Sequence, residues 1–212
     1  KENWKTYYQF MNNQLTELLT NYGPIGAIWF DGMWDQPDNF DWQLGKQYAL
    51  IHKLQPDCLI GNNHHKAPNP GEDFQMFERD LPGENKAGFS AGSTIGKLPL
   101  ETCETMNGMW GYRIKDQDYK SVPVLVRLLV KAAGKGANLL RNFGPQANGE
   151  LPAVAVERMK GMGEWMKKYG ETIYGTTAGD VHTADWGTTT RKGDKLYVHI
   201  LTDKMPEEIA LP

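Results

Sequence analysis

An acidic residue at the end of an apolar run is the first place in this chain where chemistry is expected. Residues 25–30 have the length and near-continuous apolar character of a strand buried on both faces, and Asp31 and Gly32 follow directly. In α/β barrels the catalytic groups lie at the carboxyl ends of the strands. Trp34 lies three residues further on, and its ring suits the apolar face of a sugar. Asp31 is therefore a candidate catalytic carboxylate, and the alternative is a strand cap that holds the next loop.

Further acids lie at or just after predicted strand ends, and they supply candidates for a second carboxyl group. Hydrolysis of a glycosidic bond typically uses two carboxyl groups, one ionised and one that holds a proton for the leaving group. A strand-end acid together with an acid on a later loop would give this arrangement in a barrel. For each single acid the alternative is an ordinary solvated surface position. The acids in question are Glu72, Asp73, Glu78, Glu101 and Glu104.

Two adjacent histidines, His64 and His65, follow a short apolar segment over residues 58–61. We expect at least one of them to point into a pocket and bind sugar hydroxyls. A zinc site is the alternative, because imidazole is a common zinc ligand. Adjacent side chains on an extended segment point in opposite directions, however, and no His-x-His or His-x-x-x-His spacing occurs. No metal site is predicted, and neither a phosphate-binding loop motif nor a G-x-S-x-G elbow is present.

Composition narrows the classes of partner. The net charge of -3 gives no general attraction to nucleic acid or anionic membranes, and no apolar stretch is long enough to span a bilayer. Seven Trp and nine Tyr are many for 212 residues, which suits a carbohydrate site and equally a bulky core. The sequence gives no sign of a cofactor.

Hydrophobic periodicity predicts the elements that position these residues. Helical spacing over residues 4–19, 42–54, 122–133 and 152–169 alternates with short apolar strands, which indicates a parallel sheet flanked by helices. A long loop region over 67–98 is interrupted by a short strand at 73–78. After residue 174, Gly, Thr and Asp become frequent and residues 195–201 alternate as a strand does. We therefore predict one domain over 1–170 and the beginning of an all-β module over 171–212.

Several motifs in order resemble the α-L-fucosidases of glycoside hydrolase family 29, over roughly residues 1–175. Their joint order and spacing is far more specific than any one of them alone. The motifs are Trp29-Phe30-Asp31-Gly32, Asn62-Asn63-His64, Leu100-Glu101-Thr102-Cys103-Glu104-Thr105 with Trp110-Gly111-Tyr112, and Asn138-Leu139-Leu140-Arg141-Asn142 with Gly144-Pro145.

The resemblance implies a retaining exo-glycosidase that removes terminal α-L-fucose through a covalent fucosyl-enzyme intermediate. Its fold would be part of a (β/α)8-like barrel followed by the start of a β-sandwich, and its substrates fucosylated oligosaccharides or glycoconjugates. By the same resemblance Asp31 is the nucleophile. Glu78 is the first choice for the acid/base residue and Glu101 is the second, because the loop that carries this residue varies in the family.

Candidate substrate contacts are Trp29, Trp34, His64 and Arg79. Family members usually carry arginine after the Asn-Asn pair, where this chain has His64. The corresponding contact is therefore expected to be weaker here, or to be supplied by a basic neighbour: His65, Lys66 or Arg79.

The family's N-terminal half-barrel has no counterpart in this sequence, so we expect the chain to be a C-terminal piece of a longer enzyme and inactive alone. The alternatives are a glycosidase for another sugar, a non-catalytic sugar-binding barrel and, last, a metal hydrolase that uses His64 and His65. Family resemblance would place the protein in the periplasm, outside the cell or in the lysosome. The fucosyl linkage and the oligomeric state do not follow from the sequence.

Overall fold

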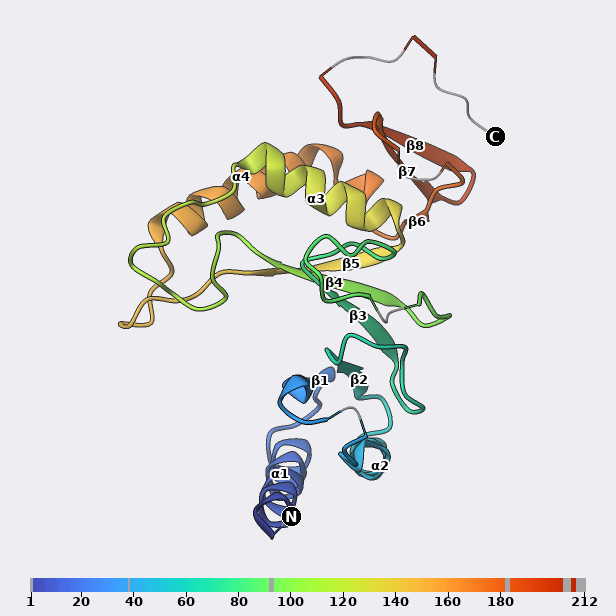
Figure 1. Cartoon of the computed structure of the whole chain (residues 1–212). Coiled ribbons are helices and arrows are strands. Elements are labelled where there is room, and N and C mark those ends of the chain that lie inside the picture. The colour runs from blue at the N-terminus through green and yellow to red at the C-terminus, as the bar shows by residue number, and fades with distance from the viewer. Residues whose placement is uncertain (1, 38, 92–93, 182–183, 204–206, 209–212) are drawn as a thin grey trace. The chain divides into compact units, whose positions relative to one another are not determined.

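A computed structural model describes residues 2–37, 39–91, 94–181, 184–203 and 207–208 (Figure 1). The chain forms two compact units. The first comprises residues 1–76 and 92–99, and the second comprises residues 77–91 and 100–212. Within the described residues, no helix is both long and apolar enough to cross a membrane.

The first unit alternates helices with parallel strands. Its β1 and β2 pair in parallel, from Ala27 opposite Leu59 to Phe30 opposite Asn62, and β2 pairs in parallel with the start of β3. The elements are α1 (Glu2–Asn21), β1 (Ala27–Phe30), the short 3-10 helix η1 (Met33–Asp35), α2 (Leu44–Leu54), β2 (Leu59–Asn62) and the first part of β3 (Phe74–Glu78).

The core of the first unit lies between one face of the strands and the two helices. Phe30 and Ile60 from the strands join Leu15 and Leu19 of α1 and Ile51 of α2 in one buried cluster. Successive side chains of a strand point to opposite faces. The residues on either side of Phe30 in the chain, Trp29 and Asp31, are consequently directed away from this core.

Gly61 on β2 has no room for a side chain. A Cβ atom there would overlap the ring of Phe74, the residue paired with it on β3. The glycine leaves room for this large ring against the neighbouring strand.

The second unit again combines parallel strands with helices and then continues into an antiparallel sheet. β4 and β5 pair in parallel from Leu100 opposite Ala137 to Thr105 opposite Asn142, and α3 and α4 lie side by side over them (Figure 1). β6, β7 and β8 form a separate antiparallel sheet. The elements are β4 (Leu100–Thr105), α3 (Val122–Gly134), β5 (Ala137–Asn142), α4 (Ala153–Tyr169), η2 (Gly170–Thr172), β6 (Thr177–Ala178), β7 (Gly187–Lys192) and β8 (Lys195–Ile200).

The predicted fold class is confirmed. The five strands follow one another in the sheet in chain order, β1-β2-β3-β4-β5, and β1–β2, β2–β3 and β4–β5 pair in parallel. Parallel strands in sequential order with helical crossovers are the arrangement of a (β/α)8 barrel, of which this is a part. The antiparallel sheet of β6, β7 and β8 lies within residues 171–212, the segment predicted to begin an all-β module. The domain boundary near residue 171 stays a prediction.

Candidate active site

Asp31 lies directly after β1, where the chain turns sharply. Gly32 has φ 89, in the left-handed region that favours glycine, and η1 begins at the next residue. The amide Nδ2 of Asn63, one residue beyond β2, donates a hydrogen bond to Oδ1 of Asp31 at 3.2 Å. Asn63 is buried, so this donor is held in place. The carboxylate of Asp31 is thereby oriented by the neighbouring strand.

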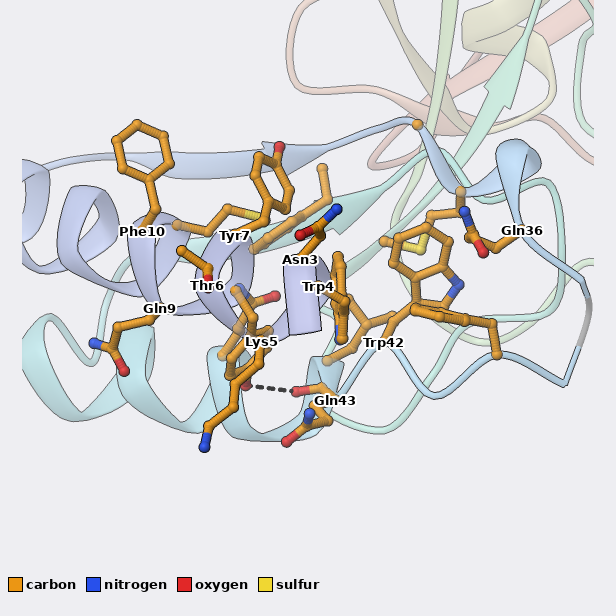
Figure 2. A pocket seen from close by; sticks show the side chains of 18 of the residues that line it. Asn3, Trp4, Lys5, Thr6, Tyr7, Gln9, Phe10, Gln36, Trp42 and Gln43 are labelled. Carbon is orange, nitrogen blue, oxygen red and sulfur yellow. Dashed lines mark hydrogen bonds between the residues drawn. The ribbon is translucent and has the colours of Figure 1, made fainter. Parts of the chain in front are cut away.

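Asp31 also lines an open groove of about 1510 Å³ in the first unit (Figure 2). One wall is the start of α1, where Trp4 packs edge-on against Trp42 with ring centroids 5.2 Å apart. Trp29 lies two residues before Asp31, and 38% of its surface is exposed. The groove therefore combines the carboxylate of Asp31 with the aromatic rings of Trp4 and Trp42, a combination that suits a sugar ring.

Trp34 is 67% exposed and lines a second cavity, of about 730 Å³, in the same unit. His64, His65 and Lys66 line this cavity too. Trp34 thus offers an accessible aromatic face three residues after Asp31, and its contact with a sugar stays a prediction.

His64 uses both of its ring nitrogens within the protein. Nε2 lies 3.0 Å from Oε1 of Glu72, and the two side chains are only 7% and 2% exposed. Nδ1 accepts a hydrogen bond from the backbone N–H of Lys66 at 3.0 Å. His64 is thus held between the carboxylate of Glu72 and the backbone of Lys66. A contact between His64 and a sugar hydroxyl would compete with these bonds and stays a prediction.

Glu72 is the centre of a buried hydrogen-bond network. Besides His64, the hydroxyl of Tyr48 donates to its Oε1 at 2.9 Å, and Nδ2 of Asn69 donates at 3.0 Å. Nδ2 of Asn62 in turn donates to the Tyr48 hydroxyl at 2.7 Å. Burial alone raises the pKa of Glu72, but the bonds from His64, Tyr48 and Asn69 outweigh it and leave the pKa lowered. Burial also raises the pKa of Tyr48, which keeps it a neutral donor.

We expect Glu72→Gln to remove a pH-dependent part of the stability. The folded-state pKa of Glu72 lies below its ordinary value of 4.5, so its stabilisation is complete above pH 4.5 and is lost as the pH falls through the folded pKa. The variant should lose about 1–3 kcal/mol of unfolding free energy at pH 7. It should also show a flatter fall below pH 4.5 than the wild type, measured by urea unfolding at several pH values.

Glu164→Gln, which changes an exposed ion pair with Lys167, is the matched control and should follow the wild-type curve. Parallel curves for Glu72→Gln and the wild type would contradict the assignment of an ionised, buried Glu72.

In the second unit, Glu78 is the last residue of β3 and its carboxylate has an aromatic partner. The indole N–H of Trp110 donates to Oε1 of Glu78 at 3.1 Å. Arg79 follows with φ 58, a left-handed conformation that is uncommon outside glycine. Its guanidinium lies 5.0 Å from the centroid of the Trp110 ring, within the range of a cation–π contact. Arg79 is therefore already engaged, and its contact with substrate stays a prediction.

Glu101 lies near the amino end of β4, whereas Glu78 lies at the carboxyl end of β3. Glu101 is the second residue of β4 and pairs with Asn138 near the start of β5. Active sites of barrels lie at the carboxyl ends of the strands, so the position of Glu78 suits catalysis better than that of Glu101. Glu104 is nearer the carboxyl end, but its Oε1 lies 3.6 Å from Nζ of Lys120 and accepts from the N–H of Thr105.

Asn63 and Trp110 were not predicted as site residues from the sequence. Both belong to motifs that carried the family resemblance, and that was the only signal available. Their contacts with Asp31 and Glu78 each join residues 32 positions apart, which no local pattern reveals. Within the described residues, no group of three or more His, Cys, Asp or Glu side chains could hold a metal ion.

Comparison with known proteins gives one consistent result. A family model described as Alpha-L-fucosidase matches residues 1–171. Plasma alpha-L-fucosidase of Rattus norvegicus is 32% identical over 208 residues, which cover 91% of this chain and 42% of that protein. The corresponding human protein is 31% identical over 201 residues, which cover 88% of this chain and 40% of that protein.

Solved structures agree. Alpha-L-fucosidase isoenzyme 1 from Paenibacillus thiaminolyticus superposes with a TM-score of 0.80 at 37% identity, covering 95% of this chain and 48% of that one. The Thermotoga maritima alpha-fucosidase in complex with a mechanism-based inhibitor gives a TM-score of 0.71 at 28% identity, covering 91% and 42%. The chain thus spans less than half the length of each of these relatives.

Proposed function

The chain belongs to the alpha-L-fucosidase family, and from this we propose that it is the C-terminal part of a retaining exo-glycosidase that releases terminal α-L-fucose from oligosaccharides or glycoconjugates. The observation that carries the proposal is the placement of Asp31. It follows a barrel strand, is oriented by the amide of Asn63, and lines a groove with aromatic walls.

In the proposed reaction Asp31 attacks the anomeric carbon of fucose while Glu78 protonates the departing glycosidic oxygen. The bond between the carbon and the leaving oxygen breaks as the bond to Asp31 forms, which gives a covalent fucosyl-enzyme. Glu78, now ionised, accepts a proton from water as the water attacks the same carbon, and Asp31 is released. The bond from Asn63 to Oδ1 leaves the attack to the second oxygen of Asp31. Two inversions at one carbon give net retention.

Trp29 and Trp34 are proposed to contact the sugar through their rings. Trp29 lies on the Asp31 side of β1, and Trp34 is largely exposed on the following turn. His64 and Arg79 are proposed to act through the side chains that they contact. His64 is bonded to Glu72, and the guanidinium of Arg79 lies over the ring of Trp110.

The proposal is tested by identifying which anomer of fucose the full-length enzyme that contains these residues releases first. Proton NMR of the hydrolysis of an aryl α-L-fucoside should show α-L-fucose before the β anomer appears by mutarotation. Initial β-L-fucose would contradict a retaining mechanism. Faster hydrolysis of another aryl glycoside, such as an α-L-rhamnoside or a β-D-galactoside, would support a glycosidase for another sugar. Binding of fucose without any turnover would support the non-catalytic barrel.

A further inference from the structure

We propose that Trp110 is a positioning residue for the proton-transfer step, and that it acts by fixing the carboxyl group of Glu78. The proposal rests on the proposed function, since it assigns a task within that reaction. Its starting point is the 3.1 Å hydrogen bond from the indole N–H of Trp110 to Oε1 of Glu78.

The turn that follows Glu78 contacts both the ring of Trp110 and the loop that carries it. The backbone N–H of Arg79 donates to the carbonyl oxygen of Cys103 on β4 at 2.8 Å, which anchors the left-handed turn. From there the guanidinium reaches over the Trp110 ring, and its Nη2 donates to the carbonyl oxygen of Gly108 at 2.7 Å. A planar guanidinium both stacks on an indole and donates in a fixed direction, so Arg79 clamps the loop that carries Trp110.

The ends of β4 and β5 hold the same loop from the other side. Nδ2 of Asn142, the last residue of β5, donates to the carbonyl oxygen of Trp110 at 2.8 Å. The hydroxyl of Thr105, the last residue of β4, donates to the carbonyl oxygen of Met109 at 2.9 Å. Gly144 lies so close to the backbone of Tyr112 that a Cβ atom would overlap it. Trp110 is therefore tied to two barrel strands and does not depend on its loop alone.

This anchoring has a chemical consequence for Glu78. An acid/base group delivers its proton to the leaving oxygen and later takes one from water, so it must keep its position through both steps. An N–H donor on Oε1 fixes the rotation of the carboxyl group. Misplacement by about 1 Å is enough to cost about 100-fold in rate. Loss of the indole N–H should thus affect leaving groups that need a proton and spare those that do not.

The experiment uses Trp110→Phe in the full-length enzyme, because phenylalanine keeps an aromatic ring and removes the donor. For each enzyme kcat/KM is measured with two substrates. The fluoride of α-L-fucosyl fluoride leaves without a proton, whereas the sugar that leaves from a fucosyl disaccharide must be protonated on its glycosidic oxygen. The value of kcat/KM reports the steps up to the first bond cleavage. The ratio of the disaccharide value to the fluoride value should fall about 10- to 100-fold in the variant.

A ratio of this kind cancels any loss of correctly folded enzyme, since such a loss lowers both values equally. Trp165→Phe, which changes an indole that packs on Tyr169 in α4, is the matched control and should keep the wild-type ratio. Arg79→Lys keeps the charge but loses the planar fork, and should lower the ratio in the same direction as Trp110→Phe. An unchanged ratio in Trp110→Phe, whether or not both values fall, would overturn the proposal. A wild type that turns over neither substrate would overturn the proposed function itself.

Discussion

Asp31→Gly in the full-length enzyme is expected to lower kcat for an aryl α-L-fucoside by about 10⁴-fold or more, because the atom that forms the covalent intermediate is lost. Asp31 follows β1 and lines the groove, and Nδ2 of Asn63 donates a hydrogen bond to its Oδ1. Removal of the carboxylate leaves the groove walls in place, so binding of fucose should persist while turnover stops. Steady-state kinetics together with titration of fucose binding separate these two quantities.

Added azide gives the same variant a sharper readout. In Asp31→Gly azide would enter from the side vacated by the carboxylate, so the product should be the inverted β-L-fucosyl azide. Asp57→Gly is the matched control, since Asp57 lies exposed in the turn before β2, and it should keep the wild-type rate. Wild-type turnover in Asp31→Gly would remove the nucleophile assignment, and so would an azide product of retained configuration.

Glu78→Ala is expected to lower kcat/KM about 10²- to 10⁴-fold for a fucosyl disaccharide, and far less for an aryl fucoside with a good leaving group. The physical reason is that a sugar alcohol cannot depart without a proton, whereas an activated phenolate can. Azide should rescue the second step in this variant, because azide needs no base. Since Asp31 is still present, the product should be the retained α-L-fucosyl azide.

Glu101→Ala is the matched comparison, because the two glutamates were rivals for one role. Glu101 lies at the amino end of β4, and we expect its variant to keep the wild-type dependence on the leaving group. Rescue by azide in Glu101→Ala and its absence in Glu78→Ala would reverse the assignment. Adding Trp110→Phe to Glu78→Ala should cause no further fall in the disaccharide-to-fluoride ratio, since the carboxyl group that Trp110 positions is already gone.

The sequence by itself determined the alternation of helices and parallel strands, because hydrophobic periodicity is a local property of the chain. It singled out Asp31 for the same reason, since an acid and a glycine directly after an apolar run mark a strand end that turns sharply. It also predicted an all-β module from residue 171, and the antiparallel sheet of β6, β7 and β8 lies within that segment. The order of four motifs then indicated the family, which comparison with known proteins bears out.

The tertiary structure places Glu78 at the end of β3 and Glu101 near the start of β4, which supports the first choice made from the sequence. The assignment of the acid/base residue stays a prediction. Only the tertiary structure supplied Asn63 as the donor to Asp31 and Trp110 as the donor to Glu78, across 32 residues in each case. It showed that His64, a candidate contact for sugar hydroxyls, is a buried partner of Glu72. Such pairings depend on which strands are neighbours and in what register. That is fixed when the whole sheet packs, and no window of the sequence contains it.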